Sequence, residues 1–140
     1  MLQRKQTIWL LLAAICAGLS MKFAFYSGNK ISTPGQAATF QSLTATSNML
    51  IDIITVVLLV GSLIVIFLYK DRRLQMRLAL VLMVLSFGNI GLYYGETKDF
   101  VAGSFTLAAA LVISIPIWLI LAMRGIRRDS KLVKSLDRLR

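Results

Sequence analysis

The chain has 140 residues, of which 57% are hydrophobic and 16% are charged, and its 16 basic and 6 acidic residues give a formal charge of +10. A soluble domain carries about 25% charged residues. This chain has too few to cover a surface in water, so we expect lipid to surround part of it. The chain has no histidine, which excludes metal and haem sites that use histidine ligands. Its only cysteine is Cys16, which excludes internal disulfides and CxxC redox pairs. We therefore expect no cofactor and no enzymatic activity.

Four apolar stretches approach the roughly 20 residues that a helix needs to cross a bilayer. They are apolar nearly all round, unlike the amphipathic helices of soluble domains, and an open sheet would leave backbone groups unpaired in lipid. The sequence predicts an all-α fold, a polytopic bundle of four transmembrane helices that forms a single domain over residues 1–140. The predicted helices cover residues 7–26, 48–69, 77–95 and 104–123, and a tail covers residues 124–140.

The first predicted helix follows two basic residues, as the apolar part of a signal peptide does. Lys22 and Phe23 stand where cleavage of a signal peptide requires small residues, so we expect an uncleaved helix. The connection that follows, residues 27–47, is polar and contains a Thr-Pro-Gly turn signal at 33–35. This composition predicts a loop or a short hairpin across the outer ends of the helices.

Asp52, in the second predicted helix, is the only carboxylate within a predicted span, and Lys22 is the only ammonium. Charge at a helix centre costs roughly 2.5–3.5 kcal/mol on insertion scales, but the helical rise places both residues near the outer interface. Three interpretations stay open. Lys22 snorkels while the helix dipole stabilises Asp52, or the two form an intramembrane ion pair, or Asp52 is the coupling carboxylate of a small transporter.

Asn89 lies deeper, in the third predicted helix, beside Gly88 and Gly91. We expect its amide to hydrogen-bond another helix, because the glycines allow a neighbouring helix to approach closely. The second outer connection, residues 96–102, is predicted to be a tight turn.

The basic residues are distributed unequally between the two ends of the predicted helices. Of the 16, 13 flank one set of helix ends, and only Lys22, Lys30 and Lys98 lie toward the other. The positive-inside rule makes the rich side cytoplasmic, and an even number of helices then places both termini there. We expect a multi-pass protein of the bacterial inner (cytoplasmic) membrane.

The tail is predicted to be a basic amphipathic C-terminal helix, because Ile126, Val133 and Leu136 fall close to helical spacing between basic residues. Such a helix suits the anionic head groups of membrane lipids, where each basic residue contributes about 1 kcal/mol. The tail has no aromatic residue for base stacking, so nucleic acid is not expected as a partner.

Three segments on the predicted cytoplasmic side resemble those of one known family. They are MLQRKQT at 1–7, FLYKDRRLQ at 67–75 and RGIRRDSKLVKSLDRLR at 124–140, in which the terminal Asp-Arg-Leu-Arg is the most specific piece. The chain is similar to a domain-of-unknown-function family of four-helix inner-membrane proteins of Bacteroidota. The resemblance implies the four-helix topology and a bacterial origin, and it implies no activity.

Two interpretations of the cytoplasmic charge stay open. It serves topology alone, or it forms a docking surface in which Asp71, Asp129 and Asp137 pair with neighbouring arginines to hold the tail against the inner loop. The preferred function is a non-enzymatic accessory or assembly subunit that docks a partner. The alternative is a small transporter or lipid-handling protein, acting as a homo-oligomer, that uses Lys22, Asp52 and Asn89. The candidate residues for docking or lipid contact are Lys70, Arg72, Arg73, Arg124, Arg127, Arg128, Lys131, Lys134, Arg138 and Arg140.

Overall fold

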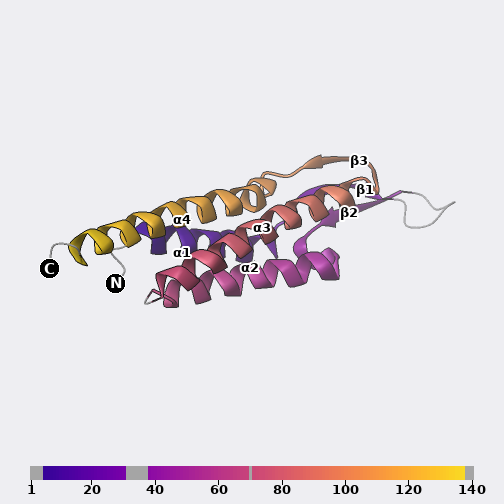
Figure 1. Cartoon of the computed structure of the whole chain (residues 1–140). Coiled ribbons are helices and arrows are strands. Elements are labelled where there is room, and N and C mark those ends of the chain that lie inside the picture. The colour runs from indigo at the N-terminus through magenta and orange to yellow at the C-terminus, as the bar shows by residue number, and fades with distance from the viewer. Residues whose placement is uncertain (1–4, 31–37, 70, 138–140) are drawn as a thin grey trace.

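The computed structural model describes residues 5–30, 38–69 and 71–137, which form four helices and one small sheet (Figure 1). The prediction of a mostly helical fold with four helices is confirmed, and the structure adds a small sheet that the all-α prediction did not include. The helices are α1 (Lys5–Ser20), α2 (Met49–Phe67), α3 (Arg72–Thr97) and α4 (Ala109–Asp137), and a 3-10 turn, η1 (Ala45–Ser47), precedes α2. The strands are β1 (Tyr26–Lys30), β2 (Thr39–Leu43) and β3 (Phe100–Phe105).

The helices form an up-and-down bundle. α1 packs against α2 and α4, and α3 packs against the same two neighbours. α1 begins and α4 ends at one end of the bundle, and the sheet lies at the other end (Figure 1). Leu10, Leu58 and Leu119 are buried in the apolar core. Trp9 of α1 stacks on Trp118 of α4 with a distance of 5.4 Å between the ring centroids, so aromatic packing joins the first and last helices.

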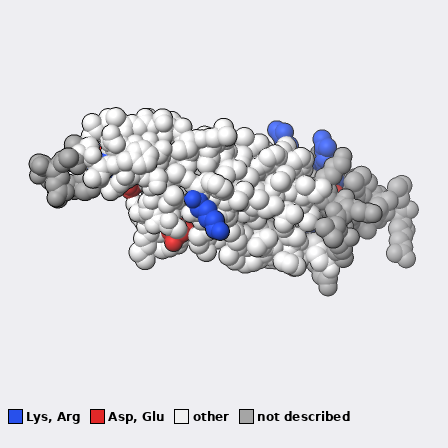
Figure 2. All heavy atoms as spheres, turned by 180° about the vertical axis from the view of Figure 1, so that it is seen from behind, with Lys and Arg blue, Asp and Glu red and all other residues white. Residues whose placement is uncertain are grey.

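The bundle exposes apolar side chains and buries polar ones. Val84 is 59% exposed, whereas Thr55 and Ser62 have no exposed surface. Most of the face in Figure 2 is accordingly uncharged. α2, α3 and the Ala109–Ser130 part of α4 are long enough and apolar enough to cross a membrane, while α1, with 16 residues, is shorter. This inverted distribution is favourable where lipid surrounds the helices, and it indicates a membrane-associated protein.

The sheet closes the end of the bundle that lies opposite the start of α1. β1 is the central strand and pairs antiparallel with β2 on one side and β3 on the other. Tyr26 lies opposite Leu43 of β2 and Phe105 of β3, so the three strands meet beside the helix ends. The predicted hairpin in the first outer connection corresponds to β1 and β2. The tight turn predicted over 96–102 is present but shorter, at residues 98–99, because β3 begins at Phe100.

The sheet also explains two incorrect helix boundaries. The first helix was predicted to reach Tyr26 but ends at Ser20, and the fourth was predicted to begin at 104 but begins at Ala109. Phe25 and Phe105 make both segments apolar, but their rings contact each other edge to face at 5.6 Å between centroids. Phe105 belongs to β3 and Phe25 leads into β1, so neither residue continues a helix.

At the opposite end the helices are longer than predicted. α3 begins at Arg72, ahead of the predicted residue 77, so the connection from α2 is short. α4 continues through Gly125 to Asp137, so the predicted helical tail is an extension of the fourth helix rather than a separate element. α4 also contains Pro116, after which the helix continues.

Candidate functional site

The first candidate site is the basic end, formed by Arg72, Arg73, Arg124, Arg127 and Arg128. Arg72 begins α3 and donates a hydrogen bond from Nη1 to the backbone carbonyl oxygen of Asp129 in α4, at 2.6 Å. This contact joins two segments that lie 57 residues apart in the chain. This contact with the backbone of Asp129 is not the pairing of carboxylate and guanidinium groups that was expected, which stays a prediction. The side chain of Asp137, also expected to pair, lies outside the described side chains.

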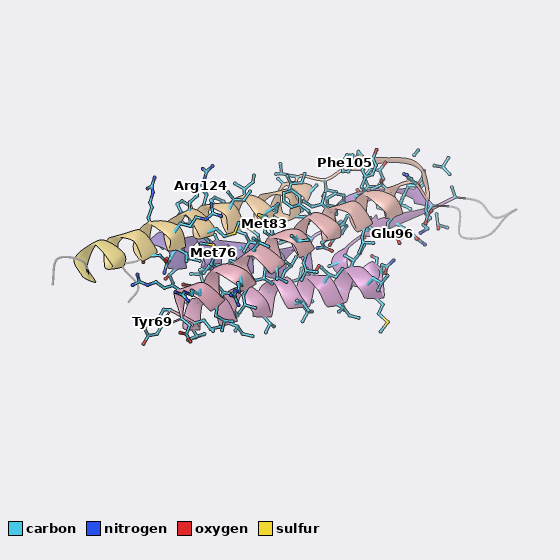
Figure 3. All side chains as sticks on the ribbon, viewed as in Figure 1. Tyr69, Met76, Met83, Glu96, Phe105 and Arg124 are labelled. Atoms are coloured by element: carbon cyan, nitrogen blue, oxygen red, sulfur yellow. The ribbon has the colours of Figure 1, made fainter. Side chains whose placement is uncertain are left out.

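The start of α1 also lies at the basic end, where it closely approaches α4. A Cβ atom on Gly125 would lie 3.0 Å from the Cβ and 3.3 Å from the Cα of Gln6, so glycine allows the two backbones to meet. Gln6 is only 3% exposed. Figure 3 shows Tyr69 and Arg124 toward this end and Glu96 and Phe105 at the sheet. The start of α1, the connection between α2 and α3, and the extension of α4 therefore lie together.

The exposed arginines of α4 form one stripe. Arg124, Arg127 and Arg128 are exposed, and their spacing of three and four residues places them on one face of the helix. Ile126, between them in sequence, is buried against the bundle. Arg73 is exposed at the start of α3. Of the other predicted docking residues, Lys70, Arg138 and Arg140 lie outside the described residues, and the side chains of Lys131 and Lys134 are outside the described side chains.

The second candidate site is a polar seam between α2 and α3. Asn48 caps the start of α2 by accepting a hydrogen bond from the backbone N–H of Leu50, and its Nδ2 donates to Glu96 Oε1 at 2.6 Å. Asn89, which was expected to bond another helix, donates from Nδ2 to Thr55 Oγ1 at 3.2 Å. Toward the basic end, Gln75 donates from Nε2 to the carbonyl oxygen of Val65 at 3.0 Å. Polar contacts therefore follow this interface over most of its length.

The centre of the seam is a group that we call the Tyr93 cluster. The fully buried Tyr93 side chain lies beside the hydroxyl groups of Thr55 and Ser20, and it is close enough to Asp52 to interact electrostatically with its carboxylate. Three oxygens of this group have no hydrogen-bond partner among the described residues. They are Asp52 Oδ1, Asn89 Oδ1 and the Tyr93 hydroxyl oxygen. The Tyr93 cluster comprises Ser20, Asp52, Thr55, Asn89 and Tyr93.

The proposed partner of Asp52, Lys22, lies elsewhere. It is exposed in the turn after α1, and no ion pair joins Lys22 and Asp52 in the part of the chain that the structure describes. An ion pair that sequence reasoning missed joins Lys30 Nζ of β1 to Asp99 Oδ2 at 3.2 Å. Tyr93 was also missed, although its place one helical turn after Asn89 on α3 is a signal that the sequence carries.

The chain belongs to a family that is defined by a domain of unknown function, DUF4293, whose sequence model matches residues 2–139. The family resemblance inferred from the sequence is therefore confirmed over nearly the whole chain. No curated protein and no solved structure matches the chain.

Proposed function

We propose that this DUF4293 protein is a non-enzymatic accessory or assembly subunit of the bacterial inner membrane that binds an acidic protein surface through its basic end. In this proposal all four helices span the membrane, and both ends of the chain are cytoplasmic. The bias of 13 basic residues out of 16 toward one set of helix ends supports the orientation. The sheet then lies on the outer side.

The observation that carries the proposal is the contact between Arg72 and the backbone of Asp129. It holds the extension of α4 beside the start of α3, so the arginines of both segments lie at the same end of the bundle. Charge that serves topology alone requires a number of basic residues but no such contact. A surface whose charges are held in place favours a specific partner.

The direction of α4 favours a protein over lipid as the partner. A helix that lies on the head groups would have to turn away from the bundle near residue 124, but α4 is continuous from Ala109 to Asp137. From Asp129 to Asp137 the helix extends about 12 Å beyond the level of its contact with Arg72. In Figure 1 this part of α4 extends past the ends of its neighbours. It is thus accessible to a cytoplasmic or membrane-protein partner.

The test replaces Arg127 with a photo-reactive residue in cells, followed by purification in mild detergent and mass spectrometry of the cross-linked peptides. We expect an adduct to a protein segment that is rich in Asp and Glu. The adduct should be lost when the remaining basic end is weakened by Arg124→Gln and Arg128→Gln.

A matched control places the photo-reactive residue at Lys98, at the sheet end, with Lys22→Gln as the accompanying charge change. This variant should give no such adduct. Adducts to lipid alone, or recovery of an uncross-linked monomer, would contradict the docking proposal.

A second candidate function is a small oligomeric transporter or lipid-handling protein. The unpartnered oxygens of Asp52 and Asn89 favour it, because polar groups inside a membrane often mark substrate or ion pathways. Lys22, being exposed beyond α1, would not take part. Asp52→Asn should abolish coupled transport but leave cross-linking at position 127 intact.

A further inference from the structure

The Tyr93 cluster draws polar groups from three helices to one level of the bundle. Thr55 of α2 and Asn89 of α3 are hydrogen-bonded. Asp52 and Tyr93 lie one helical turn from this pair on the same two helices, on the side toward the sheet. Ser20, the last residue of α1, lies beside the Tyr93 hydroxyl. The cluster therefore faces the junction of α1, α2 and α3.

Aromatic and aliphatic side chains separate the cluster from the sheet end. Phe25, which leads into β1, stacks on Tyr93 with 4.6 Å between the ring centroids. Leu43, Ile51 and Val112 are buried in the same apolar group. Polar atoms enclosed in this way cannot exchange hydrogen bonds freely with bulk water, so their own pairing decides how stable the site is.

The cluster holds oxygens that have no hydrogen-bond partner in the described part of the chain. The hydroxyl groups of Thr55 and Ser20 already donate to the carbonyl oxygens of Ile51 and Ala17, both at 2.7 Å. One amide hydrogen of Asn89 is used in the bond to Thr55. Asp52 Oδ1, Asn89 Oδ1 and the Tyr93 hydroxyl, which is itself a donor, remain without partners among the described residues. A positive group bound among these oxygens would give all three a partner at once.

We propose that the Tyr93 cluster binds one monovalent alkali cation, with Na⁺ as the expected ion. Hard cations prefer carboxylate, carbonyl and hydroxyl oxygens, and the cluster offers all three kinds. One carboxylate, Asp52, balances one positive charge. A divalent ion would keep a net charge in an apolar surrounding, which is costly. The described residues contain no group of three or more His, Cys, Asp or Glu side chains that would suit such an ion.

A proton on Asp52 is the principal competitor for this role. Protonation would remove the charge and add one donor, and with the Tyr93 O–H as a second donor it would pair the same three oxygens. A cation differs from a proton in leaving the Asp52 carboxylate charged, so its binding depends on the concentration of Na⁺ at constant pH. Another carboxylate near this end of α3, Glu96, is bonded to Asn48 and lies one turn further out.

A bound cation would hold α2 and α3 together, so binding should raise the stability of the folded state by mass action. The test measures the melting temperature of the full chain in detergent as NaCl replaces choline chloride at constant ionic strength and pH. We expect the melting temperature to rise with Na⁺ and the rise to be absent in Asp52→Asn. Glu96→Gln is the matched control and should keep the Na⁺ response.

A second variant covers the case in which Asp52→Asn does not fold. Tyr93→Phe removes one oxygen but keeps the ring that stacks on Phe25. It should weaken the apparent Kd for Na⁺ by about tenfold, the effect of losing one interaction with a charged group. Equal melting temperatures of the wild type in Na⁺ and choline would overturn the proposal. A dependence on pH without one on Na⁺ would also overturn it and identify Asp52 as a protonated group.

This proposal does not rest on the docking function. The cluster lies toward the sheet, whereas Arg124, Arg127 and Arg128 lie at the opposite end of the bundle. Loss of cross-linking at position 127 and loss of the Na⁺ response are therefore separate results.

Discussion

The two ends of the bundle are closed in different ways. At the basic end a short connection joins α2 to α3, α4 extends outward, and the side chain of Arg72 binds the backbone of Asp129. At the sheet end three strands from two separate parts of the chain cover the helices, and Phe25 stacks on Tyr93 beneath them. The basic end leaves charged side chains accessible, while the sheet end buries Phe25 and Tyr93.

This difference indicates where each kind of function can reside. Recognition of another protein requires exposed charged groups, which the arginines of the basic end supply. Binding of an ion inside a bundle requires enclosed oxygens, as the Tyr93 cluster provides. Variants that change one end at a time test whether the stability of the fold depends mainly on the sheet end.

The largest effect is expected for Phe25→Ala. Phe25 is 4% exposed and contacts both Tyr93 and Phe105. Removing a buried phenylalanine ring costs about 3–5 kcal/mol of unfolding free energy, because a cavity is left between the sheet and the helices. Denaturant unfolding in detergent measures the change. Phe40→Ala, at a position of the same sheet that is 73% exposed, is the control and should change stability by less than about 0.5 kcal/mol. Equal losses in both variants would show that the sheet does not cover a packed core.

A smaller effect is expected for Arg72→Gln at the basic end. Glutamine is too short to reach the carbonyl oxygen of Asp129, and loss of one half-buried hydrogen bond costs about 1 kcal/mol. Hydrogen exchange should become faster around residues 126–130, because this part of α4 then loses its hydrogen bond to α3. Arg73→Gln makes the same change of charge at the next, exposed position and should leave exchange unaltered. If both variants behave alike, net charge and not the hydrogen bond holds the extension.

The smallest effect is expected for Lys30→Gln, which removes the ion pair between β1 and Asp99. The Asp99 side chain is 58% exposed, so water and salt screen the interaction. An exposed pair contributes about 0.2–1 kcal/mol. The difference in unfolding free energy from the wild type should shrink further in about 1 M choline chloride. A loss as large as that of Phe25→Ala would mean that charge rather than aromatic packing secures the sheet.

Several features could be predicted from local patterns because their causes are local. The second helix was predicted over 48–69 and is observed over Met49–Phe67, since a long apolar run in lipid has no alternative to helix. Asn89 was recognised as a polar group that needs a partner on another helix. The clustering of basic residues at one set of helix ends is visible in the order of the residues alone.

Other features depend on contacts between residues far apart in the chain. β1 and β3 pair although the whole of α2 and α3 lies between them, and neither strand has an alternating pattern that would reveal it. Tyr93 joins the polar cluster only because α1 and α2 bring Ser20 and Thr55 to it. No local pattern predicts which of several buried polar groups will meet.

The sequence by itself determined the helical class, the apolar exterior and the charge difference between the two ends, because these follow from composition and from the requirement that backbone groups be paired in lipid. Only the tertiary structure decided that the apolar residues flanking the first and fourth helices form strands. It also decided that Arg72 meets Asp129 and that Asp52, Asn89 and Tyr93 come together between α2 and α3, each with an oxygen that has no hydrogen-bond partner among the described residues. The physical reason is that pairing of strands and of buried polar groups is set by the packing of whole helices.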